Sequence, residues 1–348
     1  MTNWFAIGMG SKNSKGDWLE VFYPKNLINP SEELTLKAKE LVSYREGNFT
    51  SSIPSDLVQD IAKLSKNFSS LETERTVLVF VDSKLPPNDV PSCYLRLHLL
   101  SHRLVKPNEI NLEDIFTLMP TVAWTSDGPK DPKELNDILS DKKINNEAIH
   151  IHSLDKFPCL TDYVVPEGVR IADSHRVRLG AYLGEGTTVM HEGFINFNAG
   201  TLGKSMVEGR ISQGVVVGEG SDLGGSSSTM GTLSGGNETL ISVGRDCLLG
   251  ANSGLGIPLG DRCVVEAGLY ITAGTKVEMI KSNSKVEEIK ASELSYKDDL
   301  LFIRNSLTGA VQCKPNPKTV NLNEELHSNN RSEEHTSELQ SRPHLVCR

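Results

Sequence analysis

The sequence predicts a mainly β protein: a left-handed parallel β-helix preceded by an N-terminal α/β domain and followed by a short C-terminal β domain. Three observations support this. An aliphatic residue recurs every six positions between residues 165 and 277, glycine often follows it directly, and the pattern changes on either side. A six-residue period is typical of a parallel β-helix, in which three short strands form one triangular coil. Glycine suits the tight turns between those strands.

The repeat holds its phase in several runs, and its aliphatic members are predicted to point to the axis of the prism. The phase slips before Ile211, and an excursion of glycines and small polar residues runs from Met230 to Ser242. Loops that leave a rigid solenoid are common places for binding residues. The runs are Val165, Ile171, Val177, Leu183, Val189 and Ile195; Ile211, Val217, Leu223 and Thr229; Val243, Leu249 and Leu255; and Leu259, Val265, Ile271 and Val277.

Residues 1–150 are predicted to form the mixed α/β domain. A capping residue in the stretch from Asn29 to Glu32 marks the start of its first helix. The Gly8-x-Gly10 pair is interpreted as a turn rather than a phosphate-binding loop. Alternating or continuous apolar runs predict strands at 18–22 and 76–81, and helical periodicity predicts helices at 31–42, 55–64 and 90–105.

The β-helix is assigned to residues 151–280 and the C-terminal domain, with a strand at 300–304, to residues 281–330. Residues 331–348 have no periodicity and resemble a translated sequencing adapter, so we interpret them as a non-native tail outside the fold. On this interpretation the native chain ends near Asn329 or Asn330.

Composition excludes several classes of function. A net charge of −9 and a pI near 5.6 give no reason to expect nucleic acid or an anionic membrane as a partner. No apolar run reaches the roughly 18 residues of a transmembrane helix, and no signal peptide is apparent. The six cysteines show no C-x-x-C pair, which predicts reduced thiols in a cytoplasmic protein. Cys247 and Cys263 lie within the repeat, where small buried residues are expected.

Polar residues gather in two segments of the repeat, Met190–Gly203 and Met206–Ser212. In the second, Glu208 and Arg210 are two positions apart and would share one face of a strand. They could form a purely structural ion pair on the surface of the solenoid. Alternatively, the carboxylate is poised beside a guanidinium that binds an anionic substrate group.

These segments, with 218–225, 230–236, 247–256, 264–275 and Arg304-Asn305-Ser306, closely resemble the tetrahydrodipicolinate N-succinyltransferase family in its longer bacterial form. The resemblance extends up to about Asn330. It implies transfer of a succinyl group from succinyl-CoA to the amine of ring-opened tetrahydrodipicolinate, L-2-amino-6-oxopimelate, in the succinylase branch of lysine and diaminopimelate biosynthesis. It also implies a homotrimer with sites in the grooves between prisms.

The resemblance implies a catalytic role for Glu208, either as the nucleophile that forms an acyl-anhydride or as a general base. Arg210 corresponds to a succinyl-CoA contact. Further contacts with succinyl-CoA fall at Gly225, Ser228, Ala251, Glu266, Ala267, Gly274, Lys290, Ile303, Arg304, Asn305 and Ser306.

Family members hold a divalent ion, interpreted as Mg²⁺, on the trimer axis through two acidic positions. One matches Glu192 and the other falls at His175. Imidazole is a poor ligand for a hard cation that prefers oxygen. We therefore expect a weakened metal site, or a structural His–Glu cluster in its place.

Three other functions are compatible with a β-helix of this kind. A γ-type carbonic anhydrase would need three histidines for each zinc, whereas the repeat offers His175 and His191. A hexapeptide acetyltransferase acting on another amine or hydroxyl would use His191 as its base. A non-catalytic assembly scaffold would need neither residue.

Overall fold

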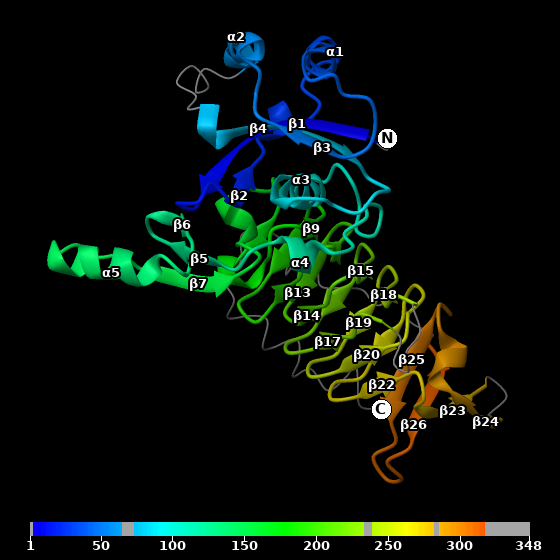
Figure 1. Ribbon diagram of the computed structural model, residues 1–348. Helices are drawn as coiled ribbons and strands as arrows, with labels where there is room; N and C mark the ends of the chain where they lie inside the picture. The colour runs from blue at the N-terminus through cyan, green and yellow to red at the C-terminus, as the bar shows by residue number, and fades with distance from the viewer. Residues whose placement is uncertain (1–2, 65–72, 233–238, 282–284, 317–348) are drawn as a thin grey trace. The chain divides into compact units, whose positions relative to one another are not determined.

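The computed structural model describes residues 3–64, 73–232, 239–281 and 285–316. The chain forms two compact units, Met1–Pro158 and Cys159–Arg348 (Figure 1). The boundaries predicted near residues 150 and 280 stay predictions. The interpreted tail at 331–348 lies outside the described residues.

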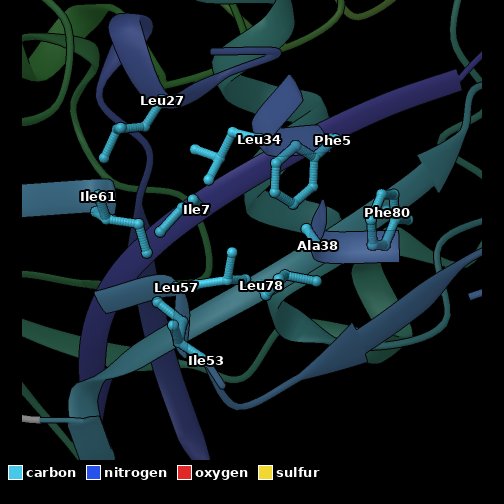
Figure 2. Packing of buried hydrophobic residues seen from close by; sticks show 10 residues of the cluster. All are labelled: Phe5, Ile7, Leu27, Leu34, Ala38, Ile53, Leu57, Ile61, Leu78 and Phe80. Atoms are coloured by element: carbon cyan, nitrogen blue, oxygen red, sulfur yellow. The ribbon is translucent and has the colours of Figure 1, made fainter. Parts of the chain in front are cut away.

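The first unit is built on a four-stranded sheet with the order β2-β1-β4-β3. The central strand β1 runs antiparallel to both of its neighbours. Figure 2 shows one face of this sheet packed against two helices: Phe5 and Ile7 of β1 meet Leu34 of α1 and Leu57 of α2. The strands and helices are β1 (Asn3–Lys12), β2 (Trp18–Phe22), β3 (Phe49–Ser51), β4 (Thr76–Asp82), α1 (Glu32–Leu41), α2 (Ser55–Leu64) and α3 (Val90–Ser101).

The sequence located these helices well. Ser31 caps α1 by accepting a hydrogen bond from the backbone N–H of Leu34. Helix α3 ends at Ser101, before the predicted Val105, because Arg103 adopts a left-handed φ of 61° that no α-helix accommodates. Seven α-helices and strands in the described part of this unit were not predicted: β1, β3, α4 (Ile115–Leu118), β5 (Val122–Thr125), β6 (Gly128–Lys130), α5 (Leu135–Ile144) and β7 (Ile151–Asp155).

The expected turn at Gly8 and Gly10 is wrong, because both glycines lie inside β1. A Cβ at Gly8 would lie 2.6 Å from Cε1 of the Tyr23 ring, and one at Gly10 would collide with the carbonyl oxygen of Glu20. These glycines therefore allow close packing against the neighbouring segment rather than a reversal of the chain.

The second unit is the predicted parallel β-helix, with three sheets that we call faces 1, 2 and 3 in the order in which the chain visits them (Figure 1). Face 1 contains β8 (Arg170–Ile171), β10 (Thr187–Val189), β13 (Ser205–Val207), β16 (Asp222–Leu223), β19 (Leu248–Leu249) and β21 (Val264–Val265). Face 2 contains β11 (Phe194–Ile195), β14 (Arg210–Ile211), β17 (Ser228–Thr229), β20 (Gly254–Gly256) and β22 (Tyr270–Thr272). Face 3 contains β9 (Tyr182–Leu183), β12 (Gly200–Thr201), β15 (Val216–Val217) and β18 (Ser242–Val243).

The repeat residues from Val177 to Val277 form the core of the prism, each at most 3% exposed. The first two repeat residues are exceptions: Ile171 is only partly buried, and Val165 is 83% exposed while the neighbouring Val164 is buried instead. A 3-10 helix at Leu160–Asp162 precedes it, and the backbone N–H of Val164 still donates to the carbonyl of Leu160. The chain therefore enters the prism later than the sequence suggested, at β8.

The lengths of the coils explain the phase slips. Val189 pairs with Val207, eighteen residues on, which is three complete hexads. Val207 pairs with Leu223, only sixteen residues on, because the corner before Ile211 is two residues shorter. The next coil contains the excursion after Met230, which an antiparallel bridge between Thr232 and Leu240 closes. Residues 233–238 lie outside the described residues.

The corner between faces 3 and 1 is held by a ladder of small side chains. Ser221 Oγ donates to the carbonyl of Gly244 at 2.6 Å, and Cys247 Sγ donates to that of Gly260 at 3.1 Å. Cys263 takes the equivalent position one coil later and donates to Lys297. The two cysteines are free and buried, as predicted, and they also act as weak donors between coils.

The C-terminal segment extends face 1. Strand β25 (Leu300–Arg304), at its predicted position, pairs in parallel with β21 and covers the last coil. Strands β23 (Lys276–Ile280), β24 (Val286–Lys290) and β26 (Val311–Pro315) complete the sheet in the order β24-β23-β26-β25-β21.

Candidate active site

Most predicted site residues lie at one edge of the prism, the turn between faces 1 and 2, which we call the first corner. Each coil contributes the residues between its inward aliphatic residue on face 1 and the next one on face 2. Positions more than 100 residues apart in sequence therefore form one line along the solenoid. In chain order they are His175, Glu192, Glu208, Arg210, Gly225, Ser228, Ala251, Glu266 and Ala267. Ile303, Arg304, Asn305 and Ser306 continue this line, because they follow Phe302 of β25, which pairs with Val265.

Glu208 occupies the coil in which this corner is shortened. Only Glu208, Gly209 and Arg210 separate the inward residues Val207 and Ile211, whereas five residues fill the corner in the coils before and after it. A shorter turn cannot project as far from the prism, so this corner is recessed. Consistently, Glu208 is only 9% exposed, although Glu192 on the preceding corner is exposed.

The backbone of the recessed corner is fixed on the side of the following coil. The N–H of Glu208 donates to the carbonyl of Leu223 at 2.9 Å, and its carbonyl accepts from the N–H of Ser226 at 3.2 Å. A Cβ at Gly209 would lie 2.5 Å from the carbonyl oxygen of Ser227 and closer still to its hydroxyl. Only glycine lets the two coils approach this closely, so the carboxylate is held on a rigid backbone.

Arg210 begins β14 on face 2, while Glu208 follows β13 on face 1. The expectation that the two share a strand face is therefore wrong, because the corner lies between them. Arg210 Nη2 donates to Ser228 Oγ at 2.7 Å, and its backbone N–H donates to the carbonyl of Ser227 at 2.7 Å. The exposed guanidinium is thus oriented along the first corner.

A second carboxylate supports the strand that leads to Glu208. Asp222 is only 6% exposed, and its Oδ1 accepts a hydrogen bond from the backbone N–H of Met206 at 2.9 Å. The shortened coil disturbs the regular ladder here, and the carbonyl of Ser221 accepts from Ser205 Oγ. Asp222 was not predicted to have a role at the site, although its position directly before the repeat residue Leu223 could have indicated one.

The far end of the first corner is built around Arg304. Glu266 Oε2 accepts from the backbone N–H of Arg304 at 2.6 Å, and Arg304 Nη1 donates to the carbonyl of Gly309 at 3.1 Å. Asn305 Oδ1 accepts from the N–H of Leu307 at 2.9 Å and stabilises the turn that follows. The predicted contact Glu266 therefore positions a cationic segment through its carboxylate.

Gly274 and Lys290 lie apart from the first corner, in the segments that follow β22 and end β24. These segments are adjacent, because the N–H of Ala291 donates to the carbonyl of Thr275 at 2.8 Å. Both predicted residues are exposed, and a Cβ at Gly274 would meet no atom within 4 Å. Packing of this single chain therefore does not require glycine at position 274.

The two predicted metal positions lie on successive coils of the first corner. His175 Nδ1 lies 3.2 Å from Asp173 Oδ1, and a hydrogen bond from the backbone N–H of His175 lowers the pKa of that carboxyl. The backbone carbonyl of Glu192 accepts from Arg176 at 2.9 Å. Within the described residues, no three His, Cys, Asp or Glu side chains gather as a metal-binding group.

The coiled prism places the protein in the hexapeptide-repeat class, and Glu208 and Arg210 are the charged pair at its recessed corner. Residues 240–273 match the family model for the hexapeptide repeat of succinyl-transferase. Residues 119–158, which include β5–β7, match the model for the middle region of tetrahydrodipicolinate N-succinyltransferase. Among the described residues, no helix is both long and apolar enough to cross a membrane.

Similar proteins specify the family. The chain is 52% identical to a 2,3,4,5-tetrahydropyridine-2,6-dicarboxylate N-succinyltransferase from Pseudomonas putida, over 93% of this chain and 98% of that protein. It is 49% identical to the Vibrio cholerae enzyme of the same name, over 94% and 99% of the two chains. A crystal structure from Campylobacter jejuni, described as a candidate 2,3,4,5-tetrahydropyridine-2-carboxylate N-succinyltransferase, has 34% identity and a TM-score of 0.82, covering 91% of this chain and 93% of that chain. The chain belongs to the tetrahydrodipicolinate N-succinyltransferase family, as its motifs predicted.

Proposed function

We propose that this protein transfers a succinyl group from succinyl-CoA to the amine of L-2-amino-6-oxopimelate. The products are N-succinyl-2-amino-6-oxopimelate and CoA, in the succinylase branch of lysine biosynthesis. The observation that carries this proposal is the position of Glu208: a buried carboxylate on the shortened corner, beside Arg210, in a chain of the N-succinyltransferase family.

Glu208 supplies the chemistry in one of two ways. As a general base, it accepts a proton while the amine nitrogen attacks the thioester carbonyl, the new C–N bond replaces the C–S bond, and the proton is passed to the departing thiolate. As a nucleophile, it first displaces CoA and forms a succinyl anhydride, which the amine then opens. Both routes need a carboxylate held in a fixed position, which the close contact at Gly209 provides.

The remaining predicted residues suit the donor. Arg210 offers a guanidinium to the succinyl carboxylate. The small residues Gly225, Ala251 and Ala267 let the pantetheine chain approach the backbone. Arg304 and Lys290 are exposed cations suited to the phosphates of CoA.

We propose that three copies assemble so that each groove between prisms completes one site. The support is that Arg210, Ala267 and Arg304 are exposed on the single chain, so a neighbouring prism would enclose the donor. The donor set does not suit an axial Mg²⁺, because each chain would offer the imidazole of His175 where an oxygen ligand is needed. No catalytic step is assigned to such an ion.

The proposal is tested by measuring CoA release from succinyl-CoA and from acetyl-CoA, each with and without the keto-amino acid. We expect sustained release of CoA only when the acceptor is present, and faster release from succinyl-CoA than from acetyl-CoA. Equal use of acetyl-CoA would contradict the proposed donor, and absence of acceptor-dependent release would contradict the reaction. Exchange of labelled CoA into succinyl-CoA in the absence of the acceptor separates the two routes, because only reversible formation of the anhydride releases CoA before the amine reacts.

A further inference from the structure

Two coils before Arg210, face 2 carries a pair of arginines for which the proposed function assigns no role. Arg176 and Arg178 flank Val177, and a parallel bridge from Val177 to Ile195 places them beside Phe194. The guanidinium carbons of the two arginines lie 5.9 Å and 5.8 Å from the centre of the Phe194 ring. One aromatic ring therefore helps to orient two cations. We call these three residues the arginine platform.

The hydrogen bonds of the platform run from the guanidinium groups to uncharged acceptors. Arg176 Nε donates to the carbonyl of Gly193 at 3.3 Å, and its Nη2 donates to that of Glu192 at 2.9 Å. Arg178 Nη1 donates to Asn196 Oδ1 at 3.1 Å. The two bonds of Arg176 use two of the five N–H groups of a guanidinium, and neither acceptor carries a charge. Arg176 is therefore oriented and still able to bind an anion.

The spacing of the coils sets the distance between the arginine platform and the recessed corner that carries Glu208. Phe194 pairs with Arg210, and Arg176 lies one coil earlier, so two coils separate Arg176 from Arg210. Neighbouring parallel strands are about 4.8 Å apart, so this separation is about 10 Å. In an extended 2-amino-6-oxopimelate, the amine lies about 7 Å from the remote carboxylate, by standard bond lengths. Glu208 lies on the same coil as Arg210. With the amine at Glu208, the reach of one arginine side chain therefore covers the difference between the coil separation and the length of the acceptor.

We propose that Arg176, supported by Arg178 and Phe194, binds the carboxylate of the acceptor that is remote from the reacting amine. The arginine platform would thereby select α-amino dicarboxylic acids over α-amino monocarboxylic acids of the same length. A guanidinium suits this role because it binds a carboxylate through two parallel hydrogen bonds. This inference rests on the proposed function and adds the means by which the acceptor is recognised.

The test compares two saturated acceptors with succinyl-CoA as donor: 2-aminopimelate, which has the remote carboxylate, and 2-aminoheptanoate, which lacks it. We expect the unmodified protein to favour the dicarboxylate. Arg176→Gln should lower kcat/KM for 2-aminopimelate by about 10- to 100-fold, mainly through KM. It should leave the KM for succinyl-CoA and the rate with 2-aminoheptanoate within about twofold. The matched control is Arg245→Gln, because Arg245 is an exposed arginine on the corner between faces 3 and 1. This variant should leave kcat/KM unchanged for both acceptors.

The possible outcomes are distinct. If the unmodified protein succinylates neither acceptor nor the keto-amino acid, the proposed function and this inference both fail. If it succinylates both acceptors equally well, or if Arg176→Gln slows both to the same extent, the inference alone fails. Arg176→Lys keeps the positive charge and covers the case in which the glutamine variant does not fold. It should retain part of the preference for the dicarboxylate, and an equal loss on both acceptors would overturn the assignment.

Discussion

Replacing Gly209 by alanine tests whether close packing of the coils sets the position of Glu208. The added Cβ would lie 2.5 Å from the carbonyl oxygen of Ser227, whereas an ordinary C···O contact is about 3.3 Å. The two coils must therefore separate by roughly 0.8 Å at this corner. The hydrogen bond from the Arg210 N–H to the Ser227 carbonyl, now 2.7 Å, would stretch to about 3.5 Å and be largely lost.

These changes should lower both the free energy of unfolding and the catalytic rate. Overpacking costs about 1–3 kcal/mol and a lost hydrogen bond about 1 kcal/mol, so Gly209→Ala should lower the free energy of unfolding by about 2–4 kcal/mol. A displacement of nearly 1 Å at a catalytic group should reduce kcat by about 100-fold. Urea unfolding and steady-state kinetics measure the two effects.

The control for stability is Gly274→Ala, since a Cβ there meets no atom within 4 Å. That variant should unfold at the same urea concentration as the unmodified protein or slightly higher, because alanine restricts the unfolded chain. If Gly209→Ala were equally stable and fully active, the coils would not determine the geometry of Glu208, and our reasoning about the recessed corner would be refuted.

Three further predictions concern other parts of the chain. Asp222→Ala should lower stability by about 1–3 kcal/mol in urea unfolding, because it orphans the buried N–H of Met206, whereas Asp222→Asn keeps an acceptor and should lose less. Burial lowers the pKa of His98 to about 3, so the folded protein keeps it neutral while the unfolded chain gains a proton below about pH 6.5. Its contribution to stability is therefore full above pH 6.5 and falls with pH toward 3, by about 2 kcal/mol at pH 5, and His98→Gln should flatten this part of a pH series of unfolding curves. Incubation with EDTA should leave turnover and the melting temperature unchanged, and a metal-dependent loss would contradict our interpretation of Glu192 and His175.

The sequence predicted the prism well because a β-helix repeats one local rule. Each inward position from Val177 to Val277 needs a small or aliphatic side chain, and the six-residue count identifies those positions without any long-range information. The count failed at Val165, before the first coil, where a 3-10 helix shifts burial to Val164. No such repeat marks α5 or the short strands β5–β7, and they were missed.

Glycine was harder to interpret outside the repeat. Gly8 and Gly10 looked like a turn, but the ring of Tyr23 and the carbonyl of Glu20 determine their role, and both belong to a later segment of the chain. A pattern within one strand cannot reveal which neighbour approaches it.

The composition of the site stays a prediction, whereas the expected arrangement of its two charged residues was wrong. Glu208 and Arg210 were recognised as a pair, but the strand assumed to carry both is a corner two residues shorter than its neighbours. The phase slip before Ile211 in the sequence is a direct result of this shorter corner. Gly274 and Lys290 were identified through family resemblance alone, and their positions away from the first corner explain why no local pattern indicated them.

The most direct test of the account is the Glu208→Gln variant, which keeps the size of the side chain and removes its basic carboxylate. We expect kcat for succinyl transfer to fall by about 100- to 10,000-fold, while the melting temperature and the Kd for CoA stay unchanged. A variant that binds CoA normally and still transfers succinyl at more than a tenth of the original rate would contradict the assignment of the recessed corner as the catalytic centre.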